Sequence, residues 1–147
     1  MNALKKSHRP GTAVTLAAAA LMSLAAYSSA AFGDEVKVTL SGAQEVPAVT
    51  TSASGSGTIM INADKSVSGS VTTTGIAGTA AHIHLAAAGK NGPVIVPLTK
   101  SGDNVWSVPA GAKLTDDQFK AYKAGDLYVN VHSAANPGGE IRAQLKP

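Results

Sequence analysis

The stretch from Ala80 to Val94 reads AAHIHLAAAGKNGPV, and it decides how the rest of the chain is interpreted. Its first part alternates imidazole and aliphatic side chains, and its second part is a Gly-Lys-Asn-Gly-Pro turn. Residues two apart in a β-strand lie on the same side, so His82 and His84 point together while Ala81 and Ile83 point the other way. Because the aliphatic residues suit the core, we expect both imidazoles on the outward, polar face of a strand.

Short strand patterns fill the chain on both sides of this stretch. Alternating apolar and polar residues predict strands over residues 36–40, 55–62, 66–73, 79–85, 94–99, 104–108, 127–132 and 140–145. The segment Thr115-Asp-Asp-Gln118, followed by Gly125, predicts one short helix that begins with a capping box. About eight strands with one helix favour an all-β fold, a Greek-key antiparallel sandwich or barrel.

Residues 1–31 are predicted to be a cleaved signal peptide, and residues 32–147 a single domain. Three basic residues open the chain, an apolar run covers residues 13–26, and small residues precede the expected cleavage between residues 30 and 33. The apolar run is shorter than the roughly 20 residues that a spanning helix needs, so we expect no membrane span after cleavage. The sequence therefore predicts an exported protein, located in the periplasm, at the cell surface or in the extracellular medium.

Charge and cysteine content exclude several classes of function. The formal net charge of +3 comes from the leader, because the nine basic and nine acidic residues beyond it cancel. No basic patch remains to indicate nucleic-acid binding. The chain contains no cysteine, which excludes disulfides, thiolate catalysis and thiolate metal ligation. Histidine is then the main side chain left, apart from methionine, for binding a borderline or soft metal ion.

A third histidine lies on another predicted strand, at the end of Leu127–His132. This strand reads LYVNVH, so its valines mark the core face, and the tyrosine, asparagine and His132 share the other. If the two strands are neighbours, His132 could lie across from His82 or His84, since directly opposed Cβ atoms are about 5 Å apart. Three such imidazoles could hold copper or zinc with an open fourth position. The alternative is a set of solvent-facing or hydrogen-bonded histidines.

Other polar residues carry weaker signals. Glu45 lies in an irregular Gln-Glu-Val-Pro segment, where it could be a carboxylate that anchors the loop or a fourth metal ligand. Glu140 and Arg142 are two apart on one predicted strand, which favours an ion pair with each other or with neighbouring groups. No serine is accompanied by the histidine and acid that nucleophilic catalysis requires. We therefore expect a binding domain rather than an enzyme.

Several motifs in combination resemble the CHRD (chordin-type) domain family. They are LSGAQEVP over residues 40–47, HIH over 82–84, GKNGPV over 89–94, YVNVH over 128–132 and PGGEIRAQ over 137–144. Ala86 and Ala143 depart from the pattern, which usually has glycine there. The resemblance implies an immunoglobulin-like β-barrel and, with a signal peptide before a single domain, a bacterial exported member. Growth-factor binding, known for animal chordin, is not carried over to this chain.

Three functional hypotheses follow from the sequence. The first is an exported, non-enzymatic binding module with a copper or zinc site at His82, His84 and His132. The second is a structural, adhesion or protein-interaction module of the cell envelope that binds no metal. The third rests on a weaker similarity to copper/zinc superoxide dismutase, which also places a His-x-His strand in a Greek-key barrel. This chain lacks the cysteines and the histidine-rich zinc loop of that enzyme, so the third hypothesis ranks last.

Overall fold

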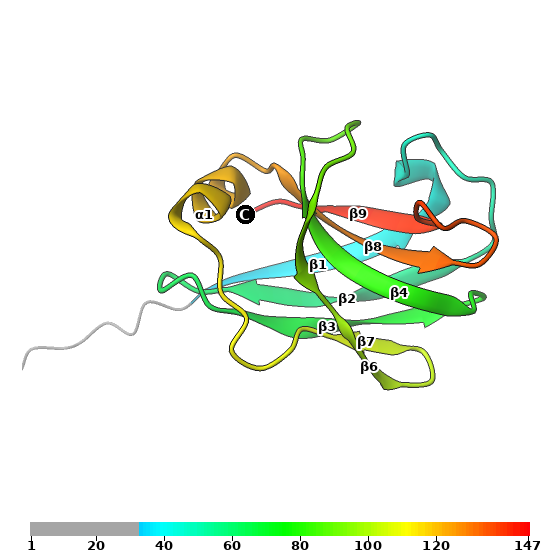
Figure 1. The fold of residues 1–147 in the computed structure, drawn as a ribbon, viewed down its shortest axis with the longest axis horizontal. Coiled ribbons are helices and arrows are strands. Elements are labelled where there is room, and N and C mark those ends of the chain that lie inside the picture. The colour runs from blue at the N-terminus through cyan, green and yellow to red at the C-terminus, as the bar shows by residue number, and fades with distance from the viewer. Residues whose placement is uncertain (1–32) are drawn as a thin grey trace, which may run out of the picture.

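The computed structural model describes residues 33–147, and the predicted signal peptide lies outside this range. The described residues form nine antiparallel strands, one α-helix and a short 3₁₀ helix (Figure 1). In chain order the elements are β1 Asp34–Ser41, η1 Gly42–Gln44, β2 Ser54–Ile61, β3 Val67–Thr74, β4 Gly78–Leu85, β5 Val94–Pro97, β6 Thr99–Gly102, β7 Val105–Ser107, α1 Asp116–Lys123, β8 Leu127–Ser133 and β9 Ile141–Leu145. The predicted all-β fold with one short helix is confirmed.

The nine strands form one sheet that curls into a nearly closed barrel. Their order is β5-β4-β8-β9-β1-β2-β3-β7-β6, so the chain jumps across the sheet after β3 and again after β7, as a Greek key requires. The two edge strands, β5 and β6, are separated in sequence only by Leu98, whose backbone N–H donates to the carbonyl of Ala81 on β4 at 2.9 Å. The edges of the sheet are thus brought together by a single buried residue.

The bend at Leu98 explains why the structure has nine strands where the sequence predicted about eight. The pattern over residues 94–99 predicted one strand, whereas the chain forms β5, bends at Leu98 and continues as β6. Leu98 is only 7% exposed, because its side chain enters the barrel at the bend. The apolar residue that prolonged the strand pattern in the sequence is therefore the residue that divides the strand in the fold.

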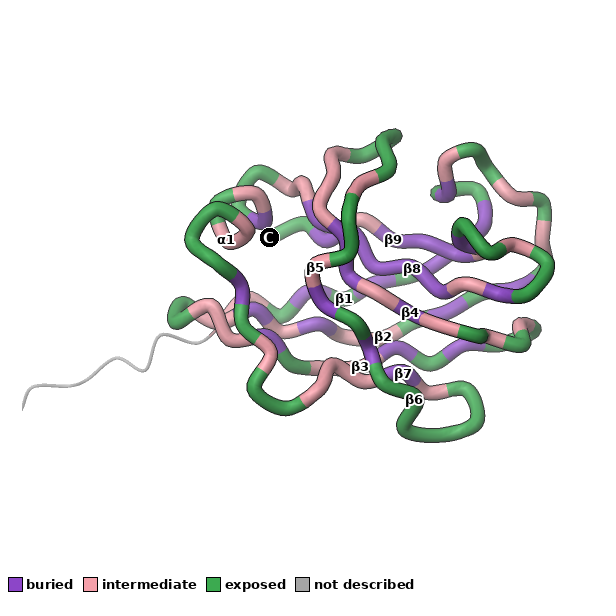
Figure 2. The backbone as a smooth tube through the Cα atoms, in the orientation of Figure 1, coloured by how far each residue is buried: buried purple, intermediate pink, exposed green. Residues whose placement is uncertain are grey.

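The barrel interior is filled by aliphatic side chains from alternate positions on the strands. Ile83 on β4, Val129 on β8 and Ile141 on β9 are fully buried, and Ala81 is 1% exposed (Figure 2). Trp106 on β7 is buried in the same cluster. Burial of this kind contributes roughly 25 cal/mol per Å² of apolar surface, and it fixes the register, because a one-residue slip would turn the aliphatic side chains outward.

The helix α1 begins as its sequence predicted. The Thr115 hydroxyl accepts from the backbone N–H of Gln118 at 3.2 Å, and the Gln118 side chain accepts from the N–H of Thr115 at 2.9 Å. Gly125 follows the helix with φ of +81°, a conformation that glycine adopts without strain. No helix in residues 33–147 is long and apolar enough to cross a membrane.

Three loops cover the outer face of β8 and β9, and this differs from the expectation that the face is exposed. They are the η1 segment with its continuation to β2, the β4–β5 loop over residues 86–93 and the β8–β9 loop over residues 134–140 (Figure 1). Tyr128 and Asn130 are 2% and 1% exposed beneath them, and His84 is 7% exposed. The predicted direction of these side chains is right, but the layer outside the sheet is buried and polar rather than open to solvent.

Candidate metal centre

The register of β4 and β8 places the three histidines in one cluster. His82 pairs directly with Asn130 and His84 with Tyr128, while His132 is opposite Ala80. The expectation that His132 would lie directly across from His82 or His84 is therefore wrong, because its partner Ala80 lies two residues before His82. Diagonal neighbours on the same face are still within reach of long side chains, so His132 contacts His82 obliquely from the adjacent strand.

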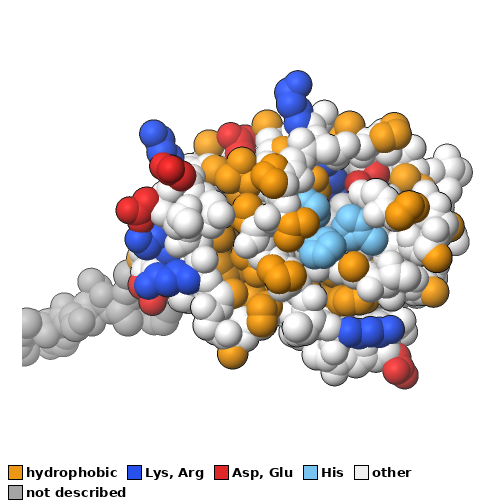
Figure 3. All heavy atoms as spheres, in the orientation of Figure 1, with side chains coloured by type: hydrophobic (Ala, Val, Ile, Leu, Met, Phe, Trp, Pro, Cys, Tyr) orange, Lys and Arg blue, Asp and Glu red, His pale blue; other side chains and the backbone are white. Residues whose placement is uncertain are grey.

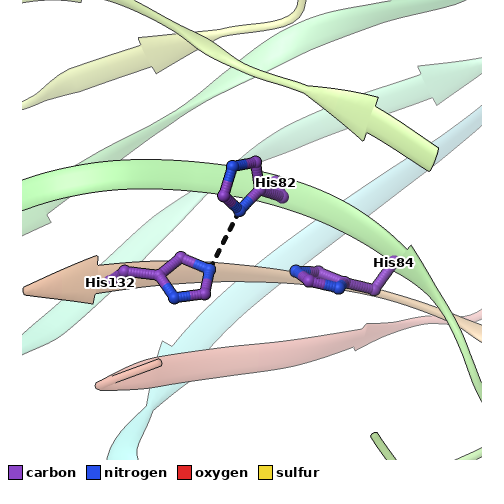
Figure 4. A group of neighbouring side chains, drawn as sticks. All are labelled: His82, His84 and His132. Atoms are coloured by element: carbon purple, nitrogen blue, oxygen red, sulfur yellow. Dashed lines mark hydrogen bonds between the residues drawn. The ribbon is translucent and has the colours of Figure 1, made fainter. Parts of the chain in front are cut away.

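The imidazoles converge on a common point (Figure 4). His82 Nδ1 and His132 Nε2 are 2.9 Å apart, and one ligand nitrogen from each of the three residues lies within 4.8 Å of the others. A shared ion with metal–nitrogen bonds near 2.0–2.1 Å keeps three ligand nitrogens about 3.3–3.6 Å apart in tetrahedral or trigonal geometry, so the most distant pair must approach by about 1 Å or more.

Backbone carbonyls determine which nitrogen of two rings carries the proton. His84 Nδ1 is 2.9 Å from the carbonyl oxygen of Gly92, and His132 Nδ1 is 2.9 Å from that of Pro137. Because a carbonyl oxygen only accepts, each Nδ1 must donate, and in the neutral ring Nε2 then keeps a free lone pair. This is the arrangement of metal-ligating histidines, whose second nitrogen donates to a carbonyl or carboxylate that orients the ring.

One nitrogen pair in the cluster shares a proton, and one further nitrogen has no partner. Because His132 Nε2 keeps its lone pair, His82 Nδ1 donates to it at 2.9 Å, and a bound metal ion would take the place of that proton. Within residues 33–147, three buried side-chain atoms lack a hydrogen-bond partner, namely Glu45 Oε1, His84 Nε2 and Asn130 Oδ1. Since His84 Nε2 belongs to the cluster, its missing partner is what an absent ligand would leave.

The electrostatics of the cluster favour neutral imidazoles. Burial lowers the pKa of His82, and its histidine neighbours lower this pKa further. Burial also lowers the pKa of His84, against the carbonyl of Gly92, which raises it. A neutral imidazole is the form that binds a metal ion, so these pKa shifts prepare the ligands for binding near neutral pH.

The His84 ring stacks on Tyr128, and Arg142 stacks on Tyr128 in turn. The ring of His84 lies parallel to that of Tyr128, at 1° and 4.7 Å between centroids, and the guanidinium carbon of Arg142 is 3.4 Å from the Tyr128 centroid. Strand β8 lies between β4 and β9, so the tyrosine ring separates the imidazole from the guanidinium. The Tyr128 hydroxyl also accepts from the backbone N–H of Gly92 at 3.3 Å, which ties the stack to the loop that orients His84.

Glu45 reaches this layer from the loop after β1 but is not one of the three clustered ligands. It is 6% exposed, and burial raises its pKa, while the Arg142 charge and the Asn130 side chain lower it. Gly139 lies directly against it, since a Cβ at that position would come within 2.5 Å of both Glu45 Oε1 and Asn130 Nδ2. Asn130 therefore lies between Glu45 and the histidines.

The ion pair predicted for Glu140 and Arg142, with each other or with neighbouring groups, is wrong for the residues that the structure describes. The carboxylate of Glu140 accepts from the hydroxyl of Thr51 at 2.7 Å and from that of Ser133. Arg142 is turned to the tyrosine stack and donates to the amide oxygens of Asn91 and Gln144, both at 3.3 Å. Residue 140 precedes β9, so the strand parity that predicted a shared face does not extend to it.

The cluster opens onto the surface of the barrel on one side. His82 and His132 are partly exposed, and the histidine side chains form a visible patch over β4 and β8, surrounded mostly by apolar atoms (Figure 3). The edge strand β5 borders this patch, because Pro97 pairs with His82 and Val94 with His84. A bound ion would thus have protein on one side and access to solvent or a partner on the other.

Sequence reasoning identified the three histidines but missed what holds them. The carbonyls of Gly92 and Pro137 are backbone groups, and the type of a residue does not show where its carbonyl points. The stacking of Arg142 on Tyr128 was not predicted, because Glu140, two residues away, suggested an ion pair instead. The GKNGPV and PGGEIR motifs, which supply both carbonyls and the arginine, were the available signal.

Comparison with known proteins identifies the family of the chain. The family model described as CHRD domain matches residues 36–145, from β1 to the end of β9. No curated protein and no solved structure matches the chain. The match covers most of the chain and includes all three histidines, both loops that orient them and Arg142. The chain therefore belongs to the CHRD domain family.

Proposed function

We propose that this protein is an exported, non-enzymatic binding module whose three-histidine cluster takes up copper. The observation that carries the proposal is the pair of carbonyl contacts at His84 and His132, which leave the Nε2 lone pairs facing a common point beside His82 Nδ1. Hydrogen-bonded surface histidines need no such shared orientation. Oriented ligands bind metal more tightly than free ones, because part of the ordering cost is already met on folding.

Copper ranks before zinc in this proposal for a chemical reason. Nitrogen ligands bind Cu²⁺ more tightly than other divalent ions of the first transition row. Three histidines with an open fourth position also hold catalytic zinc, so the ranking of copper before zinc rests on this order of affinities. Export of the domain, which rests on the predicted signal peptide, would give the site access to metal outside the cytoplasm.

Calorimetric titration of the domain with Cu²⁺ and with Zn²⁺ tests the proposal. We expect one site per chain, copper tighter than about micromolar, and a loss of at least tenfold in His82→Ala and in His132→Ala. Thr72→Ala, an exposed substitution on β3, is the control and should bind as the wild type does. Wild-type binding weaker than about micromolar for Zn²⁺ and for copper in both oxidation states, or equal binding by the histidine variants, would refute the metal proposal and favour an envelope interaction module without metal.

A further inference from the structure

The candidate ligands carry no negative charge. The three groups whose ligand atoms converge are all imidazoles, and among residues 33–147 no carboxylate joins that set. A divalent ion bound there would keep its full double charge in a partly buried site, whereas Cu⁺ would bring half as much. Cu⁺ has a filled d shell and accepts three nitrogen ligands without a further partner, and burying its single charge costs less than burying the double charge of Cu²⁺.

A buried positive charge lies behind the site. Arg142 is 1% exposed and is held against the face of Tyr128 opposite His84. Its terminal nitrogens donate to neutral amide oxygens, and the ion pairs found in the described chain, Lys65 with Asp116 and Lys123 with Asp34, do not involve it. The guanidinium therefore has no carboxylate at contact distance, and its field extends toward the histidines through a layer that excludes most water.

From these observations we infer that the centre holds copper as Cu⁺, and that Arg142 sets this preference. The inference rests on the proposed function and adds the oxidation state of the ion. Repulsion by a fixed positive charge is twice as large for Cu²⁺ as for Cu⁺ at the same place. Arg142 contacts none of the three ligand nitrogens, so it acts at a distance, as a positioning and electrostatic residue rather than a ligand.

Glu45 is the charge that opposes this effect. Its carboxylate faces the same layer, is attracted to Arg142 and lies against Asn130, which pairs with His82 across the strands. A negative charge there would favour Cu²⁺. The electrostatic explanation therefore requires opposite shifts in the reduction potential. Removing the charge of Arg142 should lower the potential, and removing the charge of Glu45 should raise it.

The reduction potential of the bound copper is the quantity to measure. The couple adds one electron from the electrode, through a soluble mediator, to protein-bound Cu²⁺ and gives protein-bound Cu⁺, and no protein group is oxidised. Affinity for Cu⁺ is measured anaerobically by competition with bicinchoninate, and affinity for Cu²⁺ by calorimetry. We expect the wild-type potential to lie above that of the aquo copper couple in the same buffer.

Three variants separate charge from structure. At a separation of about 10 Å and an effective dielectric constant of about 20, removal of the charge in Arg142→Met should lower the ratio of Cu⁺ to Cu²⁺ affinity about tenfold, equivalent to 59 mV. Arg142→Lys keeps the charge and should stay within about twofold of the wild type. Glu45→Gln keeps the shape and should raise the ratio. Thermal unfolding of each apoprotein shows whether the variant is folded.

The outcomes are distinguishable. A wild type that binds no copper in either oxidation state overturns the proposed function itself. A wild type that binds copper but prefers Cu²⁺, or Arg142→Met and Glu45→Gln variants that shift the potential in the same direction, overturns only the inference. Should Arg142→Met fail to fold, Glu45→Gln decides alone, and a potential that does not rise in that variant counts against the inference.

Discussion

Gly92 offers the sharpest test of how the β4–β5 loop orients the metal ligands. Its carbonyl accepts from His84 Nδ1 at 2.9 Å. A Cβ at this position would lie 1.9 Å from the carbonyl oxygen of Leu85 and 2.9 Å from the Cβ of Ala86. The Gly92→Ala backbone must therefore move by about 1 Å or more, which stretches the bond to His84 beyond hydrogen-bonding range.

The expected cost is a loss of metal affinity rather than of folding. Without the carbonyl, His84 can rotate or change tautomer, and loss of such an outer partner reduces metal affinity about 10–100-fold, or about 1.4–2.7 kcal/mol. Calorimetric titration with Cu²⁺ measures this loss, and thermal unfolding of the apoprotein reports any general damage.

Gly89→Ala is the matched control in the same loop. A Cβ at this position meets nothing within 4 Å, although the positive φ of +78° adds about 1–2 kcal/mol of backbone strain. We expect Gly89→Ala to bind copper within about threefold of the wild type. The reasoning fails if Gly92→Ala binds as the wild type does, or if Gly89→Ala loses as much affinity.

Three further predictions concern stability. The apoprotein should lose stability as pH falls below about 6.5, because the lowered folded-state pKa values of His82 and His84 mean that the unfolded chain takes up protons first. Unfolding midpoints between pH 8 and 5 measure this, and a midpoint that rises on acidification contradicts it. Thr115→Ala removes one bond of the capping box and should cost about 1 kcal/mol in urea unfolding, with no change in copper binding. Gly139→Ala combines a φ of +128° with a clash against Glu45 and Asn130, so it should lower the free energy of unfolding by about 2 kcal/mol or more. If this variant unfolds as the wild type does, the close packing around Gly139 is not needed for stability.

Local patterns were enough to predict most of the secondary structure. Strand parity alone placed Ile83 in the core and His82 on the opposite face, since the direction of a side chain along a strand depends only on its position. The capping box at Thr115 and the hairpin between β2 and β3 are likewise formed by residues close in sequence. The bend at Leu98 was not predictable, because it depends on where the two ends of the sheet meet.

The candidate site also combines features that local sequence patterns predict with features that only the tertiary structure determines. The sequence determined that His82, His84 and His132 lie on the outward side of two strands, because the period of two is a local property of the backbone. Only the tertiary structure decided that β4 and β8 are neighbours in a register that lets His132 reach His82. It also decided that the carbonyls of Gly92 and Pro137 orient two of the rings and that Arg142 is buried behind Tyr128. These features join residues as far apart as 84 and 142, and such contacts form only when the whole sheet has closed.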